Sequence, residues 1–160
     1  MKTFSLLLAT LLLGAGTAPT LAQQRVTAVQ TRTAPVPDEN TLARLVWTTM
    51  VTLDNANRTN NYSVLHALGS DSFQRRNTPL ALQASFAPLR NNRVDVGRVV
   101  LSTPTYYIPP QILPDGSLRL RGGFDFRPNA VRFDMVFVNI GGGWQLSALS
   151  VVETDVNAPR

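Results

Sequence analysis

The chain has 160 residues, which suits one domain, and it contains no cysteine, so thiol catalysis, disulfide-stapled folds and cysteine-ligated metals are excluded. Basic residues outnumber acidic ones by 15 to 10, a net charge of +5. The arginines are scattered singly or in pairs, without the interleaved aromatic residues of a single-strand binder, so nucleic acid is not an expected partner.

The first residues have the composition of a secretory signal peptide. Met1-Lys2 precede an apolar run from Phe4 to Ala15, which is shorter than the roughly 20 residues of a membrane-spanning helix. We expect cleavage after Ala22, a periplasmic or secreted mature protein, and no transmembrane anchor. Arginine outnumbers lysine by 14 to 1, which is typical of a GC-rich genome and predicts a bacterial source.

Residues 23–37 are rich in Gln, Thr, Ala and Pro, and they predict a flexible arm. Asp38 can cap a helix, and two neighbouring apolar stripes then recur at helical spacing as far as Asn57. The width of this apolar surface predicts a helix that is buried on more than one side. The stripes contain Leu42, Leu45, Val46, Thr49, Met50 and Leu53, and Ala43, Trp47 and Val51.

Two shorter helices are predicted next. The first covers residues 62–68, and a loop through Asp71 and Phe73 follows it. The second begins at Thr78-Pro79, because proline is favoured at the first helical position, and it should kink or end at Pro88.

Strands occupy the rest of the chain. Weak alternation over residues 94–101 predicts the first strand, and the prolines within residues 102–111 confine that segment to a sheet edge or a crossing. Asp115-Gly116 predicts a turn. Residues 118–152 then predict three strands joined by two turns, and Gly122-Gly123 within the first of them predicts a bulge or bend, so the sheet should be curved.

The register of these three strands follows from their alternation. Pairing Phe126 with Val131, and Ile140 with Gly143, places the large apolar residues on one face. The second pairing also sets Phe137 opposite Leu146 and Met135 opposite Ala148. The opposite face then carries Asp125 and Asp134 with arginine neighbours, together with an apolar patch. That patch, made of Val136, Val138, Leu149 and Val151, predicts either a homodimer interface or local cover by another part of the chain.

Three helices before a curved antiparallel sheet resemble the NTF2-like superfamily, the cone-shaped fold shared with ketosteroid isomerase and SnoaL-type cyclases. The resemblance is carried by the long helix 42–57, the short helix 62–68 and the hairpin 133–152, with its Gly142-Gly143-Trp144-Gln145-Leu146 turn. It covers residues 38–153 and leaves 154–160 as a disordered tail. It implies an α+β fold, with three N-terminal helices packed on a curved antiparallel sheet around a pocket, and often a dimer. A cystatin-like domain is the rival fold.

Catalytic members of that superfamily use an Asp base or a His–Asp pair inside the cone. The predicted concave face here holds no carboxylate, so His66, the only histidine, is the one candidate acid–base group; an ordinary packed helix residue is the competing interpretation. Aromatic side chains could line an apolar pocket, although they could also be simple core. The pocket-lining candidates are Trp47, Tyr62, His66, Phe73 and Trp144.

No metal or cofactor is expected, because the chain has one histidine, no cysteine, and neither a calcium-loop nor a phosphate-loop motif. The sequence therefore predicts an exported, non-catalytic module that binds a small apolar ligand or a protein partner. Two alternatives remain open: a cone-pocket isomerase or hydratase that uses His66, and a basic adaptor for an anionic polymer or membrane surface.

Overall fold

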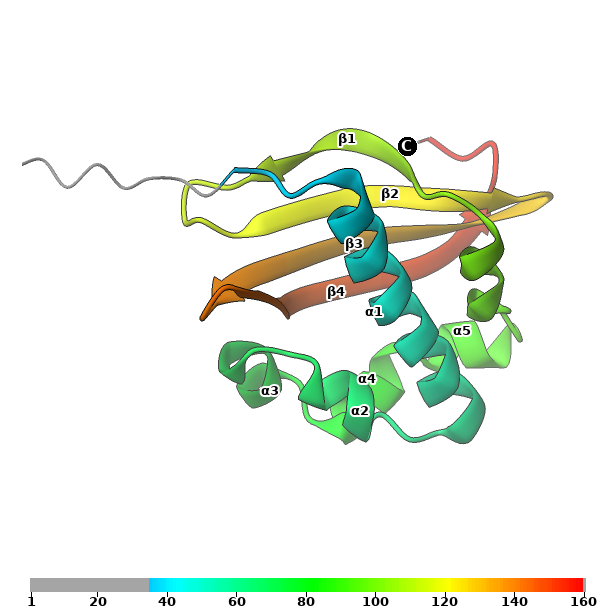
Figure 1. The fold of residues 1–160 in the computed structure, drawn as a ribbon. Helices are drawn as coiled ribbons and strands as arrows, with labels where there is room; N and C mark the ends of the chain where they lie inside the picture. Colours follow the sequence, from blue (N-terminus) through cyan, green and yellow to red (C-terminus); the bar gives the residue numbers. More distant parts are fainter. Residues whose placement is uncertain (1–34, 160) are drawn as a thin grey trace, which may run out of the picture. The chain divides into compact units, whose positions relative to one another are not determined.

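The computed structural model describes residues 35–159, so the predicted signal peptide and most of the predicted arm lie outside the described residues. The described chain is α+β, as predicted, with helices first and a four-stranded antiparallel sheet after them (Figure 1). The elements are α1 (Glu39–Thr59), α2 (Ser63–Ala67), α3 (Asp71–Arg76), α4 (Pro79–Ser85), α5 (Ala87–Asn91), the 3₁₀-helix η1 (Val96–Leu101), β1 (Thr105–Ile112), β2 (Leu118–Phe126), β3 (Asn129–Ile140) and β4 (Gly143–Asp155).

Helix α1 confirms the first predicted helix. The Asp38 side chain caps it by accepting a hydrogen bond from the Thr41 backbone N–H at 2.9 Å. The hydrogen bonds from Thr41 hold the pKa of the Asp38 carboxyl below its ordinary value. Val46, Met50 and Leu53 are fully buried along one face, as their helical spacing predicts.

The short helices differ from the prediction in number. The segment predicted as a loop forms α3, because the Ser70 hydroxyl caps the helix by accepting a hydrogen bond from the Phe73 N–H. The Phe73 ring of this helix is buried in the core. The third predicted helix is divided into α4 and α5 at Phe86, two residues before Pro88. The prediction of three helices was therefore too low, since the described chain contains five α-helices.

The first predicted strand was also wrong, because residues 96–101 form the 3₁₀-helix η1. Val96 and Val99 are both fully buried, and they are three residues apart, which is the repeat of a 3₁₀ turn and not of a strand. Val100 is 52% exposed. The sheet instead begins with β1, which is an edge strand, as its prolines require.

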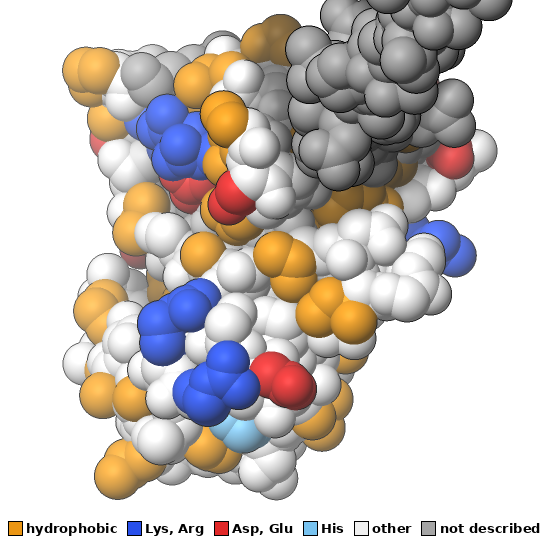
Figure 2. Space-filling view, turned by 90° about the vertical axis from the view of Figure 1, so that its left-hand side faces the viewer, with side chains coloured by type: hydrophobic (Ala, Val, Ile, Leu, Met, Phe, Trp, Pro, Cys, Tyr) orange, Lys and Arg blue, Asp and Glu red, His pale blue; other side chains and the backbone are white. Residues whose placement is uncertain are grey.

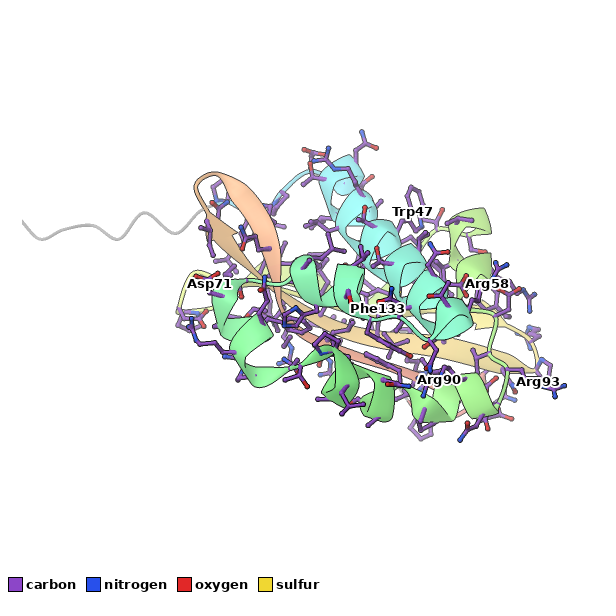
Figure 3. The ribbon with its side chains drawn as sticks, turned by 90° about the horizontal axis from the view of Figure 1, so that it is seen from below. Trp47, Arg58, Asp71, Arg90, Arg93 and Phe133 are labelled. Atoms are coloured by element: carbon purple, nitrogen blue, oxygen red, sulfur yellow. The ribbon has the colours of Figure 1, made fainter. Side chains whose placement is uncertain are left out.

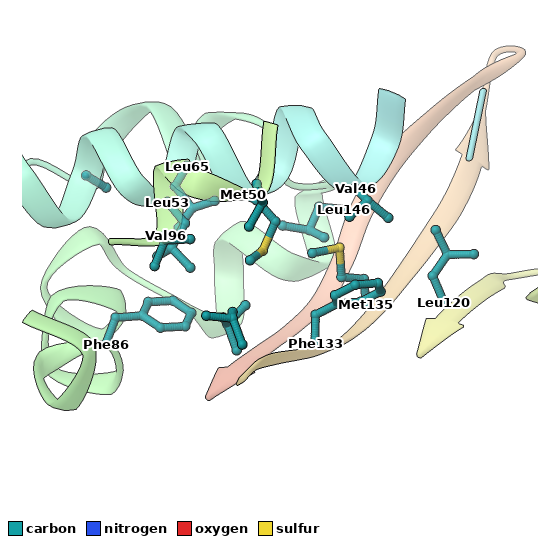
Figure 4. Close-up of a cluster of buried hydrophobic side chains, with 14 of the residues drawn as sticks. Val46, Met50, Leu53, Leu65, Phe86, Val96, Leu120, Phe133, Met135 and Leu146 are labelled. Carbon is teal, nitrogen blue, oxygen red and sulfur yellow. The ribbon is translucent and has the colours of Figure 1, made fainter. Parts of the chain in front are cut away.

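The strands follow one another in the order β1-β2-β3-β4, all antiparallel. The helices lie against one face of this sheet, with α1 running across it (Figure 1). The side chains that meet between them form one core cluster, which includes Val46, Met50 and Leu53 of α1 and Leu120 and Met135 of the sheet (Figure 4).

The β2–β3 register differs from the prediction by two residues. Phe126 pairs with Asn129, and Phe124 pairs with Val131, because the turn contains only Arg127-Pro128. A shift of two residues preserves the alternation, so the apolar residues still face the helices. On the opposite face Asp134 contacts two arginines, with 2.6 Å to Arg119 and 3.2 Å to Arg121, as expected for a surface ion pair.

The β3–β4 register agrees with the prediction near the turn and departs from it beyond Ser147. Ile140 pairs with Gly143 and Phe137 with Leu146, as predicted. A β-bulge follows, so Met135 pairs with Leu149 and not with Ala148.

The predicted apolar patch was wrong, because the bulge turns Leu149 and Val151 to the side of the sheet that faces the helices. Val151 is only 5% exposed there, and Leu149 packs against the core cluster. Val136 and Val138 stay on the opposite face, and Val152, which is 51% exposed, accompanies them. The four residues of the predicted patch therefore do not share a face.

The C-terminal segment is in contact with the sheet. Strand β4 continues to Asp155, beyond the predicted domain end at Glu153. The Arg132 guanidinium, which stands opposite Gly123 on the neighbouring strand, donates hydrogen bonds to the backbone carbonyls of Ala158 and Pro159.

Candidate functional site

A cavity with a volume of about 630 Å³ lies between the first half of α1 and the β3–β4 hairpin. The tip of the β3–β4 hairpin extends past α1 (Figure 1), and Phe137 and Trp144 of the hairpin line the cavity opposite α1. Figure 2 views the molecule from the side of this hairpin, where hydrophobic and basic side chains lie next to one another. The lining residues are Pro35, Pro37, Thr41, Arg44, Leu45, Thr48, Thr49, Leu68, Phe137, Asn139, Gly142, Gly143, Trp144 and Leu146.

Most of the cavity wall is apolar or already hydrogen-bonded. Leu45, Phe137 and Trp144 supply the large apolar surfaces. The Thr49 hydroxyl donates to the Leu45 carbonyl at 2.8 Å, and the Asn139 side-chain oxygen accepts from the Gly142 N–H at 3.1 Å. The hydrogen-bonding groups of these two side chains thus have partners within the protein.

Within residues 35–159, Arg44 is the one ionisable side chain that lines the cavity. It is exposed, and no ion pair to it is found within the described residues. Thr48, one turn further along α1, is also exposed at the rim. The cavity therefore combines an apolar interior with a cation and a hydroxyl at its mouth, which suits a ligand with an apolar body and an acidic head.

Of the five predicted pocket residues, only Trp144 lines this cavity. Tyr62 and Phe73 are each 2% exposed and belong to the core cluster, and the Tyr62 hydroxyl donates to the Asn57 side-chain oxygen at 2.6 Å. The Trp47 ring packs at the edge of the core, and its indole N–H lies 3.4 Å from the Ser102 carbonyl. None of these three aromatic residues lines the cavity.

His66 does not line the cavity either. It is half-buried on α2, and its Nε2 lies 3.2 Å from the Gln74 carbonyl oxygen. No described ion pair joins it to Asp71, which stands at the start of α3 (Figure 3). The structure thus gives this histidine a backbone partner, and no ion pair between it and a carboxylate is found within the described residues.

Besides Asp38, the cap of α1, three groups within residues 35–159 have displaced pKa values, and none of the four lines the cavity. Burial, followed by the charge of Glu39, raises the pKa of the Tyr106 hydroxyl. Hydrogen bonds from Ser117 lower the pKa of Asp115, and the hydrogen bonds that Arg119 donates to Asp134 raise the pKa of Arg119. Perturbed groups mark catalytic sites only when they converge in a cleft, and these three belong to a strand, a turn and the far face of the sheet.

Sequence reasoning missed Arg44, Thr48 and Asn139 as cavity residues. The first two occupy polar positions next to the apolar stripe of α1, and their role depends on the hairpin tip, which lies almost a hundred residues away in the sequence. Only the length of the alternating hairpin could have suggested that its tip extends past the helix.

Comparison with protein-family models, with curated proteins and with solved structures finds no match to this chain. Within residues 35–159 no helix is long and apolar enough to cross a membrane. The same residues contain no group of three or more His, Asp or Glu side chains placed to hold a metal ion.

Proposed function

We propose that this chain is an exported, non-catalytic binding module of the NTF2-like kind, which takes a small amphipathic acid into the cavity between α1 and the β3–β4 hairpin. The observation that carries the proposal is the composition of that cavity, where Arg44 is the only ionisable group among the described lining residues. A volume of about 630 Å³ lies in the range typical of small-molecule sites.

The interior of the cavity would bind the apolar part of the ligand, and the mouth would bind its acidic group. Burial of an apolar chain against Leu45, Phe137 and Trp144 contributes roughly 25 cal/mol for each Å² removed from water. Arg44 would then pair with the ligand carboxylate at the rim, where solvent limits the gain to about 1 kcal/mol or less. Affinity would come from the apolar body, and preference for an acid from Arg44.

Tryptophan fluorescence tests the proposal. The chain has two tryptophans, so Trp47→Phe leaves Trp144 as the only reporter, at the cavity wall. Titration with decanoate should shift its emission, and decanol should do so too. Arg44→Ala should weaken decanoate about 3- to 5-fold and leave decanol unchanged. An unresponsive Trp144, or equal weakening of both ligands, contradicts the proposal.

The export part of the proposal rests on the first 22 residues, which lie outside the described residues. The mass of the mature protein, recovered from cells that make it, tests this part directly. A chain that begins at Gln23 agrees with cleavage after Ala22, and one that still begins at Met1 contradicts it.

A homodimer through the face of the sheet opposite the helices is a second part of the proposal. Val136, Val138 and Val152 are apolar residues of that face, where Val136 pairs with Arg119 and Val152 pairs with Arg132. Sedimentation at micromolar concentration should find a dimer, and Val152→Arg should convert it to a monomer. A wild-type monomer would remove this part and leave the cavity proposal standing.

A further inference from the structure

A second group of cavities lies where α1 and α5 both end. The larger, of about 380 Å³, is bordered by α1, α5 and the segment after α5. The smaller, of about 230 Å³, lies on the other side of that segment, against the β2–β3 turn. The two share Arg93, Val94 and Asp95, and neither shares a lining residue with the cavity proposed above.

Arginine is the dominant charge around these cavities. Figure 3 shows Arg58, Arg90 and Arg93 at the same end of the helix layer. The full set contains five arginines, against three carboxylates. The arginines are Arg58, Arg90, Arg93, Arg98 and Arg127, and the carboxylates are Asp54, Asp95 and Glu153.

Four of these arginines have a contact or a position within the protein that accounts for an arginine there. Arg58 lies 3.9 Å from Asp54, and it also stands in the last turn of α1, where a cation complements the helix dipole. The Arg90 guanidinium donates to the Tyr62 hydroxyl, and that of Arg98 lies 4.6 Å from the centre of the Phe126 ring. Arg127 belongs to the two-residue β2–β3 turn.

Arg93 has no such explanation. It is exposed, it borders both cavities, and no ion pair to it is found within the described residues. Its backbone is left-handed, with φ of 53°. The Arg93 N–H bonds the Arg90 carbonyl, and the Val94 N–H bonds the Leu89 carbonyl, which is the Schellman ending of a helix.

Glycine is the usual residue at that position of a Schellman motif, because a side chain there costs roughly 1–2 kcal/mol. An arginine in its place opposes the local backbone preference and aids no described ion pair. Residues held in such conformations concentrate at ligand sites. The backbone conformation is therefore a second reason, independent of charge, to infer that the Arg93 side chain has a role in binding and not in ending the helix.

Asn57 supplies a second observation in the larger cavity. Its side-chain oxygen accepts the hydrogen bond from Tyr62, which fixes the orientation of the amide. Its Nδ2 is buried and has no acceptor among the described atoms. A buried donor without an acceptor costs about 1–3 kcal/mol, so a residue that lines this cavity carries a donor that the described protein atoms leave unsatisfied.

We propose that the larger cavity is a binding site for a phosphate-type oxyanion, with Arg93 as its principal ligand and Arg58 and Arg90 beside it. Planar guanidinium groups donate paired N–H bonds to phosphate oxygens, and such charge-assisted bonds are stronger than neutral ones. Arg98 and Arg127, beyond the shared wall, extend the positive surface and favour a ligand with a second phosphate group. The phosphate could belong to a free polyphosphate or to a lipid headgroup.

Isothermal titration calorimetry with pyrophosphate, at low ionic strength, tests the site. Wild type should bind, and Arg93→Gly should lower the affinity about 5-fold, as expected for the loss of one solvent-exposed guanidinium–phosphate contact of about 1 kcal/mol. Because glycine suits the left-handed backbone, Arg93→Gly should also unfold at the same temperature as wild type or higher. Loss of binding would therefore not reflect loss of the fold.

Arg75→Ala is the matched control, since Arg75 is exposed on α3 and its replacement removes the same charge. It should change the affinity less than 2-fold. Absence of pyrophosphate binding to wild type, unchanged binding to Arg93→Gly, or equal weakening by the control would overturn the proposal. Vesicles of phosphatidic acid in phosphatidylcholine distinguish the sources: Arg93-dependent binding to vesicles assigns a lipid headgroup, and its absence beside pyrophosphate binding assigns a free phosphate.

Discussion

Gly122 provides the sharpest test of the way in which β1 closes the sheet. A Cβ at this position would lie 2.3 Å from the Thr105 carbonyl oxygen and 2.9 Å from the end of the Phe133 ring. The oxygen belongs to the backbone of the paired strand, so β1 would have to move away. Overpacking of this kind costs about 1–3 kcal/mol. We therefore expect Gly122→Ala to lower the free energy of unfolding by about that amount.

Gly143→Ala is the matched control, because the nearest atom to a Cβ there is the Ile140 carbonyl oxygen, at 3.6 Å. Thermal unfolding followed by circular dichroism compares the two variants. At about 3–5 °C for each kcal/mol, Gly122→Ala should melt roughly 5–10 °C below Gly143→Ala. Equal melting temperatures would show that Thr105 does not pack over Gly122, and the pairing of β1 would then be wrong.

Three further perturbations have defined outcomes. The hydrogen bonds that Thr41 donates lower the pKa of the Asp38 carboxyl group. The stability that this carboxylate contributes is therefore present above the ordinary pKa of 3.8 and is lost as the pH falls through the lowered pKa. The melting temperature of Asp38→Ala should lie below that of wild type at pH 7 and approach it near pH 2. Met135→Ala removes a fully buried side chain and should cost about 2–5 kcal/mol in urea denaturation. Arg132→Ala removes the hydrogen bond to the Ala158 carbonyl, so amide exchange after Asp155 should accelerate with little change in the melting temperature.

The sequence was sufficient where one local signal decides the structure. Asp38 caps α1 as predicted, because the cap needs only a side-chain acceptor before an amphipathic run. Gly141-Gly142 sets the β3–β4 turn, since both residues have positive φ. The alternation of β2 and β3 placed the correct residues on the buried face, even though the predicted pairing was displaced by two residues.

The sequence was insufficient where distant contacts decide. The sequence near Ser147 contains no signal for a bulge. The bulge that forms there moves Leu149 and Val151 to the core and so divides the predicted patch. Val96 and Val99 fit a weakly alternating strand until α1 is present to bury both on one side of a 3₁₀ turn. By contrast, the signals for α3 were available, since Ser70 is a good cap.

The candidate sites were harder to foresee than the fold. Trp144 was predicted from its aromatic character, but the rest of its cavity depends on how far the hairpin extends past α1. Arg93 could not be singled out, because its left-handed backbone and its place between two cavities exist only in three dimensions. The interior that the family resemblance implied as a pocket is occupied by core side chains such as Met50 and Met135.

Native mass spectrometry of the protein with decanoate tests the central claim most directly. The comparison is between wild type and Thr48→Trp, in which a large side chain on the exposed rim of α1 narrows the mouth of the cavity while the core is untouched. We expect one decanoate for each wild-type protomer and a lower occupancy for the variant. Equal occupancy of the two proteins, or a wild type that stays bare at millimolar decanoate, would contradict the assignment of this cavity as the ligand site.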